Sequence, residues 1–314
     1  MNFVINILAL GVPFSVALLI ASLGEMVNQR AGIFNLGCEG IMAMGAFLGM
    51  LIPYAAGQGG AVSGVYNILG ILAAMGAGAL LGMIFGLSVV TFRSPQGIAG
   101  IGLQMLGVGA AGTLFRHFVG GTQSVPGIGA SPIPLLSEIP VLGQIFFNHN
   151  VLVYIAFLLV PLSWYLLNKT PWGLAVRAAG THPRAADSIG VNVAAVRFQA
   201  LAVGGAMAGL AGAYLSLCQA KMFSDTLVAG RGFIAVALVY FGHWKPARIM
   251  GGALLFSLAQ SLQLAIQGQG IHFPYEFAVM LPYVLVIVVL AFSRRNKHLS
   301  PMALGKPFNR EMRV

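Results

Sequence analysis

Long stretches without an acidic or basic side chain alternate with short charged segments along the chain. A helix that crosses a bilayer needs roughly 20 mostly apolar residues. The stretch 40–92 is 53 residues long, which is enough for two helices and a turn within PYAAGQGGAVS at 53–63. The pattern predicts about nine membrane-spanning helices (roughly eight to ten), in the stretches 1–24, 40–92, 94–115, 139–168, 198–220, 232–244, 249–275 and 277–293.

The predicted fold is an all-α, polytopic transmembrane bundle. No segment shows the alternation of roughly ten residues that marks an outer-membrane barrel. Gly and Ala are frequent within the predicted helices, which favours close helix packing. The segment 229–242 is short and contains Arg231, so we expect it to be tilted, broken or half-inserted. Residues 1–293 form one predicted transmembrane domain, followed by a basic tail, 294–314.

Composition excludes other protein classes. Hydrophobic residues make up 58% of the chain and charged residues 8%, and the mean hydropathy is +0.88. A soluble domain carries about 25% charged residues, so this chain is not a soluble enzyme, a disordered protein or a disulfide scaffold. Cys38 and Cys218 lie in apolar stretches and are interpreted as small core residues.

The basic residues indicate an orientation. With nine spans and a cytoplasmic C-terminal tail, 14 of the 17 Lys and Arg fall inside, and Arg116, Lys221 and Arg231 fall outside. This distribution predicts a multi-pass membrane protein with a cytoplasmic C-terminus and an external N-terminus. The basic residues form no single patch, so nucleic acid is not an expected partner.

Two loops differ in character. The predicted external loop, 117–150, is rich in Gly, Pro and Ser and is long enough to act as a lid or docking surface. The predicted cytoplasmic loop, 168–197, contains a candidate short helix that starts at Pro183, with Thr181 as its side-chain cap and Gly190 at its end. A short interfacial helix suits a transporter that is driven by a soluble partner; a simple connecting loop is the alternative.

Polar residues near the second span suggest a broken or re-entrant helix. Glu39 is followed by an apolar run and has Asn35 as its polar neighbour. Acids in a membrane usually face a protein interior or a wet cavity, and nearby glycines would loosen the helix. The alternative places Glu39 at the cytoplasmic interface, paired with Arg30. Gln104, within the fourth span, is a second candidate for solute contact or for a structural hydrogen bond.

No catalytic or metal-binding constellation is present in the sequence. The six histidines are scattered, and neither an HExxH pair nor a CxxC motif occurs. A phosphate-binding GxxxxGK[ST] loop is also absent, so the chain does not hydrolyse nucleotides alone. Active transport would then draw its energy from ions or from a partner. An ion-driven carrier would normally need paired intramembrane charges, and an intramembrane enzyme would need a nucleophile–base pair.

Three stretches carry a family resemblance. WGLAVRAAGTHPRAADSIGVNVAAVR (172–197) resembles the cytoplasmic loop of permease subunits of bacterial ABC importers for sugars, branched-chain amino acids and nucleosides. QRAGIFNLGCEGIMAMGAF (29–47) and AGRGFIAVALVYFGHWKPARIMGGALLFSLAQSLQ (229–263) resemble signatures of the nucleoside-type branch. The likeness extends from about residue 23 to residue 292. Importers of riboflavin and other heterocycles look similar.

The resemblance implies an assembly in a bacterial cytoplasmic (inner) membrane. A second, non-identical permease shares the pathway, two ATP-binding cassette subunits carry ATP and Mg²⁺, and a periplasmic or lipoprotein binding protein delivers the solute. No cofactor belongs to this chain itself. The segment implied to contact the ATPase consists of Gly180, Pro183, Arg184, Ala185, Ala186 and Asp187.

The same resemblance places Asn35 and Glu39 on the broken segment near the pathway. Gln104 departs from it, because an Asn is expected there. A nucleoside also needs aromatic faces for stacking, for which Phe34 and Phe233 are the candidates. Glu39 is expected to accept a hydrogen bond from solute or to hold the broken segment, so that glutamine would preserve its role and alanine would not. The leading hypothesis is a nucleoside importer permease; a riboflavin or sugar importer and an ion-driven carrier are the alternatives.

Overall fold

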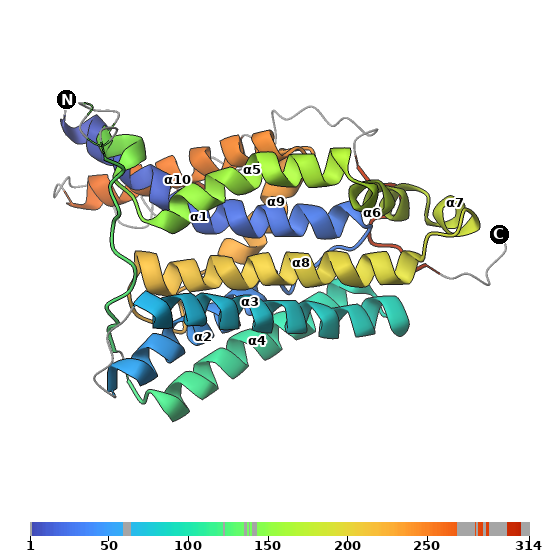
Figure 1. Cartoon of the computed structure of the whole chain (residues 1–314), viewed down its shortest axis with the longest axis horizontal. Helices are drawn as coiled ribbons and strands as arrows, with labels where there is room; N and C mark the ends of the chain where they lie inside the picture. The colour runs from blue at the N-terminus through green and yellow to red at the C-terminus, as the bar shows by residue number, and fades with distance from the viewer. Residues whose placement is uncertain are drawn as a thin grey trace.

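The computed structural model describes residues 2–58, 64–121, 123–134, 137, 139, 143–268, 280, 282–284, 287–288 and 300–308. These residues form an all-α bundle whose long helices lie roughly side by side (Figure 1). The helices are α1 (Asn2–Arg30), α2 (Cys38–Gln58), α3 (Gly64–Gly86), η1 (Leu87–Thr91), α4 (Gln96–Phe118), η2 (Gly143–Phe147), α5 (Val151–Lys169), α6 (Pro171–Thr181), α7 (Pro183–Ser188), α8 (Val193–Tyr214), η3 (Leu215–Gln219), α9 (Arg231–Phe241) and α10 (Pro246–Gly268).

Seven helices in the described part of the chain are long and apolar enough to cross a membrane. They are α1, α2, α3 with η1, α4, α5, α8 with η3, and α10. The predicted short segment at 229–242 is α9, which has only 11 residues and does not span a bilayer by itself. The predicted last span, 277–293, lies largely outside the described residues, so the count of nine stays a prediction.

Helices α1 and α8 form the centre of the bundle. In α8 with η3, 72% of the most apolar window is buried inside the protein, against 33% in α3, α4 and α5. Close packing depends on glycine, as the sequence predicted. A Cβ at Gly78 of α3 would collide with the carbonyl oxygen of Gly205 of α8, and one at Gly45 of α2 with that of Gly209. The peripheral helices α3, α4 and α5 expose apolar side chains, which can contact lipid or other subunits.

The bundle has two distinct ends. α6, α7 and residues 300–308 lie at one end, called here the α7 end (Figure 1). The other end, called the η3 end, holds η3 and the segment 123–128, where Val125 N–H donates to the Lys221 carbonyl oxygen and Asn67 Nδ2 donates to that of Gly127. α1 and α8 run antiparallel, since Gly24 packs on Gly204 while the Tyr214 hydroxyl donates to the Pro13 carbonyl oxygen.

Two non-helical segments enter the bundle from opposite ends. The first break, residues 31–37, follows α1 at the α7 end and leads inward to α2. The second break, residues 220–230, follows η3 at the other end and leads inward to α9. Gly40 packs against Gln104, eight residues into α4, which is about 12 Å along that helix. The second span, predicted to be broken or re-entrant, is thus a continuous helix that a non-helical segment precedes inside the bundle, and a second such segment precedes α9.

Candidate functional site

The two breaks meet at Glu39, in the first turn of α2. The Glu39 carboxylate accepts hydrogen bonds from the backbone N–H groups of Gly230 and Gly232, both at 2.7 Å. These groups belong to the N-terminus of α9, where the helix dipole favours a negative charge. Glu39 is 6% exposed, so this contact lies inside the protein. The carboxylate thus joins the beginnings of the long helix α2 and the short helix α9, which the chain reaches from opposite ends of the bundle.

The alternative pairing of Glu39 with Arg30 is not what the structure shows. The Arg30 guanidinium donates instead to the Trp244 carbonyl oxygen, at 2.9 Å. Arg231, expected on the external side, lies at the beginning of α9 beside the Glu39 contact, and it donates to the Leu227 carbonyl oxygen. It is half-buried and lies at the junction of the two breaks.

A second buried carboxylate, Glu25 of α1, was missed by the sequence analysis. It accepts hydrogen bonds from Asn28 Nδ2 at 2.9 Å, Gln29 Nε2 at 3.1 Å and the Asn35 backbone N–H at 3.1 Å. Trp244 Nε1 donates to Gln29 Oε1, which extends this network to the end of α9. The signal was the spacing of positions 25, 28 and 29, which share one helix face. The predicted first span ended at residue 24, one position short of it.

The predicted pathway residue Asn35 lies in the first break and is buried. Its side-chain oxygen accepts a hydrogen bond from the Gly37 N–H, which makes a local turn before α2. The neighbouring Phe34 N–H donates to the side-chain oxygen of Gln96, while the Gln96 Nε2 is buried without a hydrogen-bond partner. The backbone of the first break is thus held by side chains from α1 and α4.

The aromatic candidates lie on a partly exposed face. The rings of Phe34 and Tyr240 pack edge to face with centroids 6.1 Å apart, and Tyr240 packs on Trp244. Phe233 lies two turns before Tyr240 on the same side of α9, and both are about 40% exposed. Gln104 is half-buried on α4. We call Phe34, Phe233 and Tyr240 the aromatic strip. The predicted pathway residues therefore divide into buried ones, Asn35 and Glu39, and surface ones, Phe34, Phe233 and Gln104.

The predicted short helix is present as α7, Pro183–Ser188. Ala186 is buried, whereas Arg184 and Ala185 are exposed. The predicted Thr181 cap is wrong. Thr181 is the last residue of α6 and its hydroxyl bonds back to the Arg177 carbonyl oxygen, so His182 occupies the N-cap position without a side-chain hydrogen bond. Ile189, which is 78% exposed directly after α7, was not singled out from the sequence.

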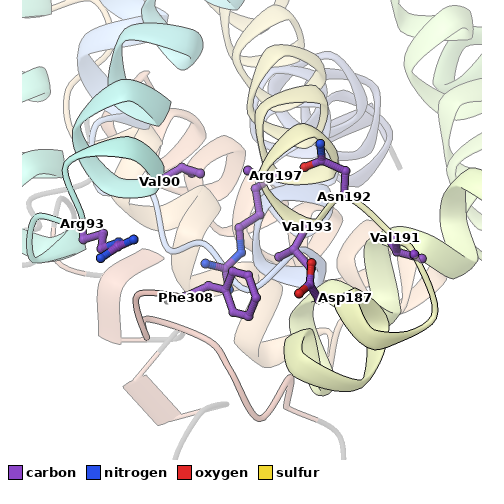
Figure 2. A pocket seen from close by; sticks show the side chains of 10 residues that line it. Val90, Arg93, Asp187, Val191, Asn192, Val193, Arg197 and Phe308 are labelled. Carbon is purple, nitrogen blue, oxygen red and sulfur yellow. The ribbon is translucent and has the colours of Figure 1, made fainter. Parts of the chain in front are cut away.

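Two cavities flank α7. One of about 440 Å³ lies toward α8 and is lined by Arg93, Asp187, Arg197 and Phe308 among others (Figure 2). The other, of about 500 Å³, lies between α7 and residues 302–308 and is lined by Arg184 and again by Phe308. Within the part of the chain that the structure describes, no group of three or more His, Cys, Asp or Glu could hold a metal ion.

Comparison with known proteins decides the family. The family model for the branched-chain amino acid transport system permease component matches residues 6–290. This chain belongs to that permease family. The resemblance seen in the three sequence stretches is thereby confirmed.

Three relatives of this permease match it over nearly their whole length. The guanosine ABC transporter permease protein NupQ of Bacillus subtilis is 35% identical over 97% of this chain and 98% of its own. The putative glucose ABC transporter permease protein TsgC13 of Haloferax volcanii is 34% identical, over 99% and 100%. The nucleoside ABC transporter permease protein NupC of Lactococcus lactis is 36% identical, over 93% of each chain. No solved structure matches.

Proposed function

We propose that this permease forms, with a second and non-identical permease, the translocation pathway for a nucleoside or a similar small polar heterocycle. The similarity to NupQ and NupC, which extends over nearly the whole chain, carries this proposal. A binding protein outside the membrane would deliver the solute, and two ATP-binding cassette subunits would hydrolyse ATP with Mg²⁺. The chain itself has no phosphate-binding loop, so it depends on these partners for energy.

The aromatic strip supports a flat, polar solute. Phe233 and Tyr240 present rings on a surface of the single chain, where a second permease would complete the bore. A base can stack on such rings, and Gln104 can exchange hydrogen bonds with it. Asn35 and Glu39 would act from behind this surface, because their side chains already bind backbone groups of the protein. Their proposed role is to keep the beginnings of α2 and α9 in place beside the solute.

The exposed face of α7 supports docking of the ATPase subunits. Arg184 and Ala185 point away from the bundle, and Ala186 and Gly180 anchor the segment to it. Charge reversal of Arg184 should lower uptake and ATPase stimulation while membrane insertion stays normal. We further propose that the α7 end is cytoplasmic, with the N-terminus external. Residues 300–308, Arg30 and Arg93 all lie at that end, in agreement with the distribution of basic residues.

Uptake by the complete transporter tests the proposed function. Proteoliposomes that contain both permeases, the ATPases and the binding protein should accumulate radiolabelled guanosine or uridine with ATP. Phe233→Ala should reduce uptake about tenfold through loss of stacking, whereas Phe233→Tyr should retain most of it. The similarity to a protein named for glucose keeps a sugar as the second candidate. Accumulation of glucose or riboflavin, and not of nucleosides, would contradict a nucleoside substrate.

A further inference from the structure

Three chain segments are tied together at the α7 end of the bundle. Gly32, the second residue of the first break, lies in the left-handed region, with φ of +86°. Its carbonyl oxygen accepts from the Gly305 N–H at 3.2 Å, and the Gly180 carbonyl oxygen, in the last turn of α6, accepts from the Ala303 N–H at 2.9 Å. The segment 300–305 therefore binds the first break and the end of α6 at once. We call this segment the strap.

Gly180 and Gly32 are in direct contact beneath the strap. A Cβ at Gly180 would collide with the Arg30 carbonyl oxygen and approach the Gly32 nitrogen to 2.9 Å. Since Cβ atoms do not tolerate such distances, only glycine allows α6 to approach the first break this closely. The end of α6 cannot move without displacing either the strap or the break.

Arg197 makes a second link from α7 to the same point. It lies in α8, which begins directly after the turn that follows α7, and it is 1% exposed. Its Nε donates to the Ala31 carbonyl oxygen at 3.2 Å, while one terminal nitrogen, Nη2, is buried without a hydrogen-bond partner. That nitrogen lies 3.1 Å from the position a Cβ of Gly32 would take. A buried guanidinium with an unsatisfied donor is costly, which suggests a functional reason for its place.

The space around α7 determines how its movement is transmitted. Cavities of about 440 and 500 Å³ lie on its two sides, and Phe308, just after the strap, borders both (Figure 2). Packing against these sides is incomplete, so a displacement of α7 is passed on mainly through its two ends. One end leads through His182 to Gly180, and the other leads through Asn192, the side-chain cap of α8, to Arg197.

We propose that the strap and Arg197 are positioning elements that couple α7 to the first break. When the ATPase subunits move α7, Gly180 and Arg197 shift residues 31–37, and with them the Glu25 and Glu39 contacts at the beginnings of α2 and α9. This inference rests on the proposed docking of the ATPases at α7. It assigns a role to residues 300–305 and to Arg197 that neither the family match nor the solute proposal requires.

The test uses the complete transporter in proteoliposomes, with both guanosine uptake and ATP hydrolysis measured. Ala303→Pro removes the N–H that binds Gly180, and Ala303→Gly keeps it as the matched control. Met302→Ala, at the exposed neighbouring residue, serves as a second control. We expect Ala303→Pro to lower the guanosine transported per ATP about tenfold, with ATP hydrolysis changed less than about twofold. Arg197→Gln should have the same effect, and Arg197→Lys should restore part of the ratio.

A second measurement does not depend on variants. In the wild-type complex, hydrogen exchange of the backbone amides in 31–37 should change about tenfold when ATP is bound by the ATPases, because the segment moves with α7. An unchanged exchange rate in the wild type overturns the proposal.

The Ala303→Pro complex gives a further criterion. If this complex is less abundant than the wild type but transports the same number of guanosine molecules per ATP hydrolysed, the proposal is also overturned.

The outcomes also separate this inference from the proposed function. If the wild type takes up no nucleoside, the solute proposal fails. If Arg184→Glu leaves uptake and ATPase stimulation intact, docking at α7 fails and the coupling inference fails with it. If the wild type transports, Arg184→Glu blocks transport and Ala303→Pro behaves like Ala303→Gly, then only the role of the strap is wrong.

Discussion

The two breaks differ in burial and in backbone conformation. Both interrupt helices inside a bundle, where unpaired backbone groups are costly. The first break, 31–37, is mostly buried and places glycine at its left-handed residue, Gly32. The second break, 220–230, is mostly exposed or half-exposed and puts Lys221 and Ala229, besides Gly230, in the left-handed region, with φ of +53°, +46° and +80°. The buried first break thus has a relaxed backbone, whereas the more exposed second break has a strained one.

The carboxylates at the two breaks also differ in what they bind. Glu25 accepts mainly from side-chain amides, those of Asn28 and Gln29, besides one backbone N–H. Among the residues that the structure describes, Glu39 accepts only from backbone N–H groups, one on each oxygen. A side-chain amide can rotate to exchange its donor for its acceptor, whereas a backbone N–H cannot. The first carboxylate therefore sits in an adaptable network, and the second in a fixed one.

Substitution of Glu39 is expected to have the largest effect on uptake. Glutamine has one acceptor oxygen, so in Glu39→Gln one glycine N–H would face the NH₂ group of the new side chain, and the beginning of α9 would separate from α2. Such a buried mismatch costs about 1–3 kcal/mol. We expect both Glu39→Gln and Glu39→Ala to lower uptake about tenfold or more, measured in assembled complexes. This reverses the expectation from the sequence that glutamine would preserve the role.

Glu25→Gln should be milder and provides the control for Glu39. Its oxygen can still accept from Gln29 and Asn35, and the new NH₂ group can donate to Asn28 Oδ1, which is buried without a partner. We expect uptake within about threefold of the wild type and a melting temperature close to it. Glu25→Ala, which leaves three donors unpaired, should be impaired much more. Equal damage from Glu25→Gln and Glu39→Gln would break the comparison between the two breaks.

Ala229→Gly should stabilise the purified permease slightly. A non-glycine residue in the left-handed region costs roughly 1–2 kcal/mol, and glycine removes this strain at a smaller cost in unfolded-chain entropy. The expected gain is about 1 kcal/mol, seen as a higher melting temperature in detergent. Gly32→Ala, the converse change at the buried break, should lower it. A destabilised Ala229→Gly protein would show that the strain at the second break has been misjudged.

The smallest effect is expected at the ion pair that closes the second break toward α4. Arg116 donates to Asp225 at 2.7 Å, and both side chains are more than half exposed. Such pairs contribute about 0–1 kcal/mol and are screened by salt. Asp225→Asn should therefore change the melting temperature little at low ionic strength and not at all in high salt. A large, salt-independent loss of stability would mean that this end of the break is held as firmly as the buried one.

The sequence predicted those features that depend on local pattern. Charge-free stretches marked the long helices because lipid rejects charged side chains wherever they occur. Pro183 and Gly190 marked α7, since the conformational limits of these residues act within one turn. The prediction of Thr181 as a cap was wrong because Thr181 belongs to the preceding helix, α6. The sequence pattern did not distinguish α6 from the loop. Likewise the predicted loop 168–197 extends into α8, whose beginning at Val193 is set by the Asn192 cap.

Only the tertiary structure decided which polar groups meet. Glu39 and Gly230 are 191 positions apart, and Arg197 and Ala31 are 166 apart. No local periodicity specifies such pairs, because they depend on where inside the bundle α2 and α9 begin and on glycine contacts between central helices. The sequence therefore identified Glu39 as a buried acid near a broken helix, but its partner on α9, the Glu25 network and the burial of Arg197 follow from packing. Lipid sets the pattern of a span, whereas the need to satisfy every buried backbone group sets the contacts at its breaks.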